Sequence, residues 1–280
     1  MRPISLLILI LFLLLFRFVT AQENGLPFIK NYPPKEYKGA AQNWDIEQDE
    51  RGIMYFANGD AGILQYDGAF WKHIPIPNNS TVRALEFDEE TGKIFVGAVN
   101  DFGYLDTDSS GNLFFSSLKH LLPSSSNDFS DIWTIQTTPE GVYFYSDKQL
   151  MRVKNGKIKL WFPQNSFYLS YQVRDDIYLY EYGRGLLKLN KNDELKLVPN
   201  SSFIKNERMY SLVPNGDKLL VGTRQNNIYL YDPEEENPEL AWKLFGSNEI
   251  YQEFKNGRLY NITKYKDEYI INTLGSGLLF

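Results

Sequence analysis

Short apolar strands alternate with glycine-containing turns along this chain, and the pattern returns at a regular interval. Four copies of the turn and strand keep the glycine, and they are Ala61–Tyr66, Phe102–Leu105, Arg184–Leu189 and Ser276–Phe280. Two further copies lack it, Lys148–Val153 and Asn226–Tyr231. With residues 62, 103, 149, 185, 227 and 277 as markers, the spacings are 41, 46, 36, 42 and 50 residues. Periods of this length with several short strands per unit are typical of β-propeller blades.

The first repeat predicts four strands, at residues 42–46, 53–57, 63–66 and 70–74. Asp67-Gly68 lies between the last two strands and is typical of a two-residue hairpin turn, because glycine accepts a positive φ. The same order recurs in the later repeats, although the first strand of the fourth repeat, near Tyr168, is poorly marked. No stretch has a sustained apolar period of 3.6 residues. We therefore predict an all-β fold, a β-propeller of four-stranded antiparallel blades.

Residues 22–280 contain five near-complete blades and part of a sixth, and the last repeat stops at Phe280 before its final strand. Propellers have about four to eight blades. We therefore expect the propeller to be truncated at its C-terminus, with a missing portion that supplies the rest of the ring. In the alternative arrangement, five blades close and the last strands belong to an incomplete neighbour.

Residues 1–21 differ from the repeats. Arg2 gives a positive start, Ile4–Phe16 is apolar apart from Ser5, and Val19–Ala21 places small residues before Gln22. This order predicts a cleaved signal peptide and an exported protein. The apolar run is shorter than the roughly 20 residues that span a bilayer. An uncleaved anchor is the alternative.

Composition and charge exclude several classes of function. The chain has no cysteine, so disulfides, thiolate metal sites and thiol nucleophiles are excluded. Its 43% hydrophobic and 15% aromatic content supplies a large core. Removal of Arg2 and Arg17 from 29 Lys and Arg, against 35 Asp and Glu, leaves a formal net charge of −8. A negative chain without a basic run is not expected to contact nucleic acid.

Motifs for catalysis or metal binding are weak. His73 and His120 have no nucleophile motif around them. Asp106–Gly111 begins like a calcium loop, but Ser117 stands where a bidentate glutamate is needed, so a plain turn explains it better. We expect no catalytic residue, no metal and no cofactor. A pair of carboxylates for glycoside hydrolysis remains open among the 35 acids.

A candidate binding set comes from the second position of the first strand in successive repeats. Its members are Trp44, Arg83, Trp133, Tyr210 and Tyr260. Aromatic rings at a central opening could stack on sugar faces, while an arginine binds a carboxylate or hydroxyl group. Alternatively, these side chains pack between neighbouring blades, as every propeller requires.

The repeat resembles the two-component-regulator propeller repeat. The matching segments are Asn43–Ile46, Gly52–Ala57, Gly62–Leu64, Tyr66–Gly68, Ile132–Ile135 and Leu220–Thr223. The opening Gly25–Tyr32, with Gln42–Trp44 and Asp101–Leu105, is similar to the start of the triple-tyrosine regulators of Bacteroidetes. The resemblance covers essentially everything after residue 21.

That resemblance implies an exported propeller followed by a β-sandwich, a membrane helix and a cytoplasmic histidine kinase or helix-turn-helix output. Only the propeller part is present in this sequence. We therefore expect a periplasmic, non-catalytic sensory segment of a regulator that is anchored in the inner membrane. Its expected partners are an oligosaccharide or another small extracellular ligand, the missing domains of the same polypeptide and, in the full-length form, a second copy. The competing class is a secreted propeller enzyme, a glycosidase or lyase, that acts on polysaccharide.

Overall fold

A computed structural model describes residues 29–279 of this protein, except residues 61, 225–226, 248, 250 and 253–256. The predicted signal peptide at residues 1–21 lies outside the described residues. The described strands form six antiparallel sheets, five with four strands and one with three. Within the same residues, no helix has the length and apolarity that crossing a membrane requires. The predicted all-β propeller is confirmed.

Each sheet is one blade, and its strands follow one another in chain order. Blade 1 contains β1 (Asn43–Gln48), β2 (Met54–Asn58), β3 (Ile63–Tyr66) and β4 (Trp71–Ile74). Blade 2 contains β5 (Val82–Asp88), β6 (Lys93–Ala98), β7 (Asp101–Thr107) and β8 (Leu113–Ser117). Blade 3 contains β9 (Thr134–Thr138), β10 (Gly141–Tyr145), β11 (Leu150–Lys154) and β12 (Lys157–Trp161).

The second half of the chain repeats this plan. Blade 4 contains β13 (Phe167–Val173), β14 (Asp176–Glu181), β15 (Gly185–Leu189) and β16 (Leu195–Leu197). Blade 5 contains β17 (Met209–Asn215), β18 (Lys218–Thr223), β19 (Ile228–Tyr231) and β20 (Trp242–Leu244). Blade 6 contains β21 (Leu259–Tyr265), β22 (Glu268–Thr273) and β23 (Leu278–Leu279).

Short helical turns lie in the segments outside the strands. They are α2 (Pro34–Tyr37), η2 (Pro77–Asn79), η3 (Lys119–Leu121), η4 (Ser124–Ser126), η5 (Ser201–Ile204) and α3 (Pro238–Ala241).

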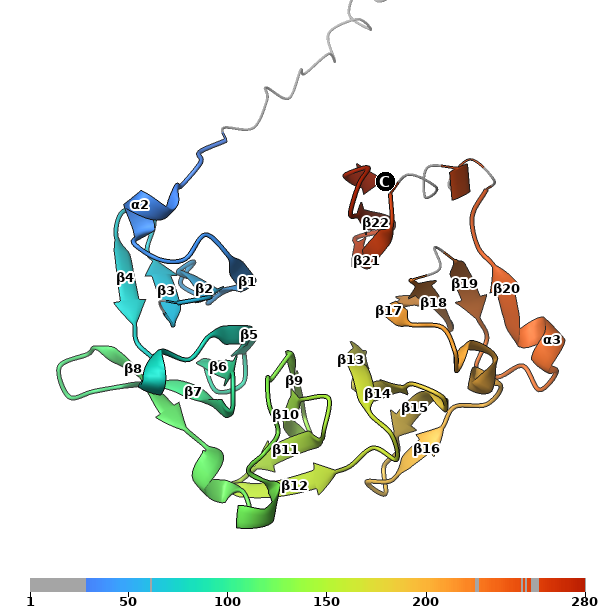
Figure 1. Ribbon diagram of the computed structural model, residues 1–280, viewed down its shortest axis with the longest axis horizontal. Coiled ribbons are helices and arrows are strands. Elements are labelled where there is room, and N and C mark those ends of the chain that lie inside the picture. Colours follow the sequence, from blue (N-terminus) through green and yellow to red (C-terminus); the bar gives the residue numbers. More distant parts are fainter. Residues whose placement is uncertain are drawn as a thin grey trace, which may run out of the picture.

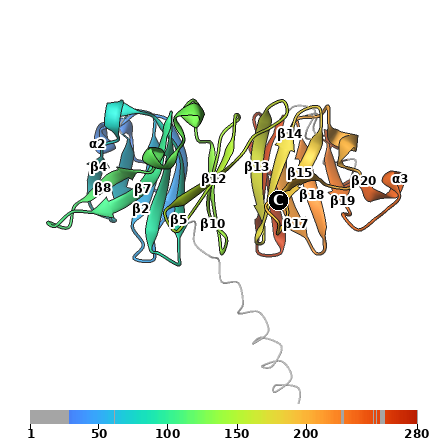
Figure 2. The same cartoon turned by 90° about the horizontal axis from the view of Figure 1, so that it is seen from below.

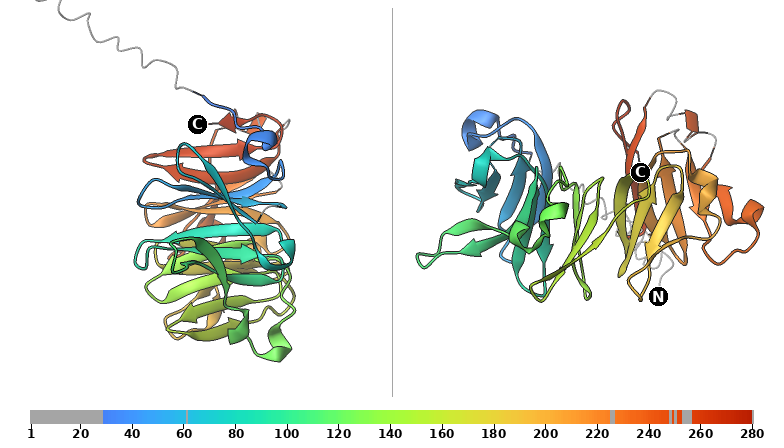
Figure 3. Two further views of the ribbon diagram at one scale, coloured as in Figure 1. Left: turned by 90° about the vertical axis from the view of Figure 1, so that its left-hand side faces the viewer. Right: turned by 60° about the horizontal axis from the view of Figure 1, so that its bottom comes forward.

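The blades surround one axis, and the first strand of each blade lies nearest to it (Figure 1). Side views show the blades at one level (Figures 2 and 3). Each inner strand packs against the next, from β1 through β5, β9, β13 and β17 to β21. The sixth sheet therefore continues the same ring, and the alternative in which five blades close is wrong. In Figure 1 the ring is open between β21 and β1.

The hydrophobic cores lie between blades. Five clusters of buried side chains each join two consecutive blades, and one of them packs Tyr55 and Ile63 of blade 1 against Val82 and Val96 of blade 2. A strand in the middle of a blade is therefore covered on both faces. This explains why β6 and β14 are continuous apolar runs, without the alternation of a half-exposed sheet.

The marker glycine of the repeat has a steric cause. Gly185 has a φ of +120°, and a Cβ atom placed on it would lie 2.6 Å from the carbonyl oxygen of Ser201. Only glycine tolerates both the dihedral angle and this close approach of the next backbone segment. Gly62 and Gly103 also face a backbone carbonyl oxygen too closely for a Cβ atom, so the periodic glycine is a packing requirement in blades 1, 2 and 4.

One predicted turn is wrong in detail. The strands β3 and β4 pair Tyr66 with Trp71, so residues 67–70 form a four-residue loop in place of the predicted two-residue turn. The Asp67 carboxylate accepts hydrogen bonds from the backbone N–H groups of Ala69 and Phe70 at 2.9 and 2.7 Å. These bonds stabilise the longer loop, because they pair amides that the wider turn leaves free.

Candidate ligand-binding face of the propeller

The inner strands begin at one end of the propeller, which we call the entry face. They turn into the second strands at the opposite end, the exit face. At the entry face, the pairing of five inner strands with their second strands contains a β-bulge. The unpaired residues in these bulges are Trp44, Arg83, Tyr168, Tyr210 and Tyr260.

Blade 3 places a tryptophan at the corresponding point. Trp133 comes directly before β9. Its backbone N–H donates to the carbonyl of Tyr145 at the end of β10, at 2.9 Å. The five residues that the sequence singled out therefore occupy equivalent positions. Tyr168 completes the set, which we call the mouth residues: Trp44, Arg83, Trp133, Tyr168, Tyr210 and Tyr260.

A β-bulge changes what the affected side chain can do. The extra residue leaves the regular ladder, bends the strand and re-aims its side chain. The same device at the start of five inner strands presents one side chain per blade beside the central opening. This is the arrangement from which a single ligand could contact several blades at once.

Three mouth residues from blades 1, 2 and 3 form one cluster. The guanidinium carbon of Arg83 lies 4.0 Å from the ring centroid of Trp44 and 5.0 Å from that of Trp133. The two indoles meet edge to face, with 6.0 Å between their centroids. Arg83 Nε also lies 3.5 Å from Asp131 Oδ2, an ion pair that is too long for a well-formed hydrogen bond.

This cluster supports the packing interpretation for Arg83. Its charge is opposite a carboxylate and its flat faces are covered by indoles, so little of the guanidinium remains for a ligand. The indoles are still 39% and 41% exposed, at Trp44 and Trp133 respectively. The cluster links three blades and leaves apolar edges on which a sugar ring could lie.

The other mouth residues lie in blades 4, 5 and 6. Tyr168 and Tyr210 are half-buried neighbours, with 6.3 Å between ring centroids. Burial raises the pKa of Tyr168, the Tyr210 hydroxyl raises it further, and Arg208 and Arg224 lower it. Tyr260 is 59% exposed and makes no ring contact with another described aromatic residue. The structure thus pairs Tyr210 with Tyr168 and leaves Tyr260 apart.

Carboxylates lie along the inner strands of blades 1 and 2. Asp45 Oδ2 accepts a hydrogen bond from the backbone N–H of Leu85 on the next inner strand, at 2.9 Å. Burial, followed by the charge of Asp45, raises the pKa of Glu47 to about 7. Burial, followed by the charge of Glu47, raises the pKa of Glu86 to about 7. Hydrogen bonds oppose both shifts: the backbone N–H groups of Gln48 and Phe87 donate to Glu47, and the hydroxyl and backbone N–H of Thr137 donate to Glu86.

These contacts have a structural purpose. An inner strand has no partner strand on its channel side, so its outward N–H groups need acceptors. The carboxylates of one blade supply acceptors for the inner strand of the next blade. The acidic residues of the channel wall therefore join neighbouring blades.

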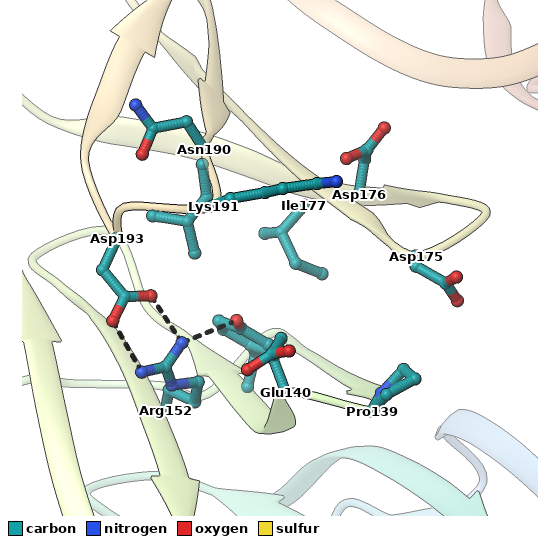
Figure 4. Close-up of a pocket in the computed structure, with 11 residues that line it drawn as sticks. Pro139, Glu140, Arg152, Asp175, Asp176, Ile177, Asn190, Lys191 and Asp193 are labelled. Carbon is teal, nitrogen blue, oxygen red and sulfur yellow. Dashed lines mark hydrogen bonds and ion pairs between the residues drawn. The ribbon is translucent and has the colours of Figure 1, made fainter.

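A separate cavity of about 450 Å³ lies at the exit face between blades 3 and 4 (Figure 4). Arg152 forms a two-pronged ion pair with Asp193, at 2.6 and 2.9 Å, and Lys159 binds the same carboxylate at 2.8 Å. Asp176 and Glu140 are paired with Lys188 and Lys154. The ion pairs with Asp193 join blades 3 and 4, whereas Asp175 and Lys191, which also line the cavity, form no ion pair among the described residues.

The remaining sequence candidates have local roles. Asp108 Oδ1 accepts from the backbone N–H groups of Ser110 and Asn112, both at 2.8 Å, which is the expected plain turn. His73 Nε2 lies 2.6 Å from the carbonyl of Tyr37, and His120 Nδ1 lies 3.1 Å from that of Ser117. Both imidazoles are hydrogen-bonded to backbone and stand away from the mouth residues along the chain.

Sequence reasoning missed two groups of residues. Asp45 lies on the strand predicted at residues 42–46 and Glu47 lies one residue beyond it, so the prediction did not group the two carboxylates, which alternate on β1. Arg208 and Arg224 flank the ends of two paired strands, and only the pairing of Met209 with Thr223 brings them together. No local pattern would have associated them.

No protein-family model matches the chain, and no curated protein matches it either. Solved structures do. The extracellular domain of BT3049 from B. thetaiotaomicron, assigned as a hybrid two component system, aligns with a TM-score of 0.59 and 16% identity over 92% of this chain and 34% of its own. The corresponding domain of BT4673 from the same organism aligns with a TM-score of 0.58 and 15% identity over 82% and 30%.

The chain spans about a third of the length of these two structures. The WD40 β-propeller domain of Doa1 aligns with a TM-score of 0.56 and 10% identity, over 86% of this chain and 92% of its own. At such identities the likeness establishes the fold. The chain is thus a β-propeller similar to extracellular domains of hybrid two-component systems.

Proposed function

We propose that this chain is the extracytoplasmic sensory propeller of a signal-transducing regulator, and that it binds a small extracellular ligand, an oligosaccharide, at its entry face. The observation that carries the proposal is that the entry face presents one such residue per blade, five from β-bulges and Trp133 from the position directly before β9. Five of these six residues are aromatic. Sugar rings have flat apolar faces and polar rims, which half-exposed aromatic side chains suit. The likeness to extracellular domains of two-component systems supports the sensory role.

Export, periplasmic location and anchoring of the longer protein belong to the same proposal. The apolar leader at residues 4–16 supports export. The domains that would anchor and transmit the signal would belong to the rest of the polypeptide. Cell fractionation of the native host tests this, because a cytoplasmic protein could not sense an extracellular sugar.

The ligand proposal is tested by isothermal titration calorimetry against a panel of neutral and acidic oligosaccharides. We expect one class to bind, and we expect Tyr210→Ala to weaken binding by about tenfold, as the loss of a stacking aromatic does. Tyr265→Ala is the matched control, since Tyr265 is a 57% exposed tyrosine at the exit-face end of β21. Equal losses in both variants, or no binding to any member of the panel, would contradict the proposal.

One observation favours the competing enzyme. Glu47 and Glu86 have pKa values raised to about 7, as a general acid in a glycosidase needs. Their hydrogen bonds to the next inner strand favour the structural role instead. Release of reducing sugars by the wild-type protein, abolished in Glu47→Gln or Glu86→Gln, would decide for the enzyme.

A further inference from the structure

Two exposed arginines at the entry face, Arg208 and Arg224, stand together without an acidic partner in the part of the chain that the structure describes. Arg208 and Arg224 are exposed, and neither forms an ion pair or a side-chain hydrogen bond with any described residue. An acidic partner lies beside each of four other described arginines, namely Arg51, Arg83, Arg152 and Arg184. Arg174 and Arg258 also have no ion pair among the described residues, but each stands apart from a second arginine along the chain and in the strand pairing. In a chain with an acidic excess, unpaired cations that stand together require an explanation.

The two arginines are neighbours in space. The backbone N–H of Arg224 donates to the carbonyl of Arg208 at 2.8 Å, where β17 begins and β18 has ended. The guanidinium carbon of Arg208 lies 5.5 Å from the ring centroid of Tyr168. The charges of both arginines lower the pKa of Tyr168, so both guanidinium groups lie within electrostatic range of its hydroxyl.

The nearest acid along the chain does not neutralise them. Glu207 precedes Arg208, but its Oε1 accepts a hydrogen bond from the Tyr229 hydroxyl at 3.3 Å, and its Oε2 is buried. The Glu207 carboxylate is thus engaged inside the blade. The two cations remain available at the surface beside two half-buried tyrosine rings.

This combination has a specific chemistry. A guanidinium presents a planar set of N–H donors that matches the oxygens of a carboxylate or a sulfate group. A ring stacked beside such a cation binds the flat face of the molecule that carries the anion. A neutral sugar would use only the aromatic half of this arrangement.

We propose that Arg208 and Arg224 form an anion subsite, which binds the carboxylate or sulfate of an acidic oligosaccharide whose sugar ring lies against Tyr168 and Tyr210. The inference rests on the proposed function and narrows its ligand to acidic sugars. It also separates the two halves of the entry face, because the anion subsite belongs to blades 4 and 5 alone.

The subsite itself is tested without any sugar. Arginine Nε–Hε NMR signals are followed while inorganic sulfate replaces chloride at constant ionic strength. We expect the signals of Arg208 and Arg224 to shift in a saturable manner. The signal of Arg174, an exposed arginine at the exit face whose side chain donates to the Gly216 carbonyl, should stay in place. Equal, unsaturable shifts at all three arginines would overturn the subsite.

The ligand class is tested with trigalacturonate, a sulfated chondroitin tetrasaccharide and neutral oligosaccharides of matched length. We expect one acidic sugar to bind, with affinity that falls at higher salt and by about tenfold in Arg208→Ala and Arg224→Ala. Arg174→Ala should bind as the wild type does. Preference for trigalacturonate assigns a carboxylate, and preference for the chondroitin fragment assigns a sulfate.

The outcomes distinguish the two proposals. A neutral sugar that binds through Tyr210 and ignores both arginine substitutions would overturn the anion subsite and leave the sensory function standing. An acidic sugar that needs the arginines but ignores Tyr210→Ala would uphold the subsite and remove the aromatic platform. The circular dichroism melting curve of each variant checks that an exposed substitution has left the fold intact.

Discussion

Blades 1–3 and blades 4–6 both present aromatic residues and arginines at the entry face, but the arginines of the two halves have different partners. In the first half, Arg83 is stacked between Trp44 and Trp133 and stands opposite Asp131. In the second half, arginines stand beside tyrosines without an acidic partner among the described residues. The difference shows that an aromatic–arginine cluster is not by itself a binding site. The partner of the cation decides whether it joins blades or remains open to a ligand.

The inner walls of the two halves differ in a parallel way. Between blades 1, 2 and 3, carboxylates accept hydrogen bonds from the neighbouring inner strand. Between blades 5 and 6, the hydroxyl of Ser211 accepts from the N–H of Ile262 at 2.7 Å. Between blades 4 and 5, the Tyr171 hydroxyl donates to the Met209 carbonyl at 3.0 Å. Carboxylates thus join the blades of the first half, and hydroxyl groups join those of the second half.

The largest difference in stability between the two halves should come from substitutions at a pair of equivalent glycines. A Cβ atom on Gly97 would lie 2.5 Å from Cγ2 and 2.9 Å from Cβ of Ile132, whose branched stem cannot move aside. On Gly222 it would lie 2.9 Å from Cδ1 of Ile262, the mobile end of a side chain. We expect Gly97→Ala to lower the free energy of unfolding by about 3 kcal/mol and Gly222→Ala by about 1 kcal/mol. Urea unfolding followed by circular dichroism measures both.

A reversed order for these two glycines would mean that the joint between blades 2 and 3 is the looser one. Gly68→Ala serves as a control for general effects of an added methyl group. Its turn offers open space around the new atom, although its φ of +97° adds backbone strain.

Substitutions at the mouth residues should produce a smaller difference in stability between the two halves. Trp44→Ala removes an indole stacked on Arg83, and we expect it to lower the free energy of unfolding by about 2 kcal/mol. Tyr260→Ala, at an exposed ring, should cost less than about 0.5 kcal/mol. Unfolding midpoints in urea give the comparison. If Trp44→Ala were as harmless as Tyr260→Ala, the blade 1–3 cluster would have no structural role, and its aromatic groups would be free for a ligand.

The smallest effect concerns pH. Glu47 and Glu86 have pKa values of about 7 in the folded protein, against 4.5 for an ordinary glutamate. Protonation is therefore favoured by folding, and this contribution to stability is complete below about pH 4.5 and lost as the pH rises through about 7. The melting temperature should accordingly increase as the pH is lowered from about 8 to about 5. Glu47→Gln and Glu86→Gln should flatten that rise, whereas an unchanged slope in both variants would contradict the raised pKa values.

Much of the fold could be predicted from the sequence because short local segments, a turn glycine followed by an apolar strand, define each repeat. The sequence predicts the third strand of blade 1 at residues 63–66, where the structure has it, because a turn glycine precedes the apolar run and a second turn follows it. The first strand of blade 4 was poorly marked. Its bulge at Tyr168 and the mixed polarity of Ser170 and Gln172 disturb the alternation that identifies a strand.

The site could be predicted only in part. Equivalent positions in the repeat identified five of the six mouth residues, since the bulge recurs at a fixed distance from the strand start. Which cation is paired depends on packing between blades. Asp131 lies 48 residues beyond Arg83, and no periodicity relates the two. Arg208 and Arg224 escaped notice for the same reason.

The recurring bulge also bears on how such a protein can change its specificity. A residue that has left the ladder can be exchanged without shifting the register of its strand, because no cross-strand pair depends on it. At the entry face of blades 4–6, the side chain at the bulge can therefore change while the strand register stays constant, whereas the Trp44–Arg83–Trp133 cluster also links blades. Natural selection or protein engineering could therefore change the binding specificity one blade at a time, while the packing between blades preserves the fold.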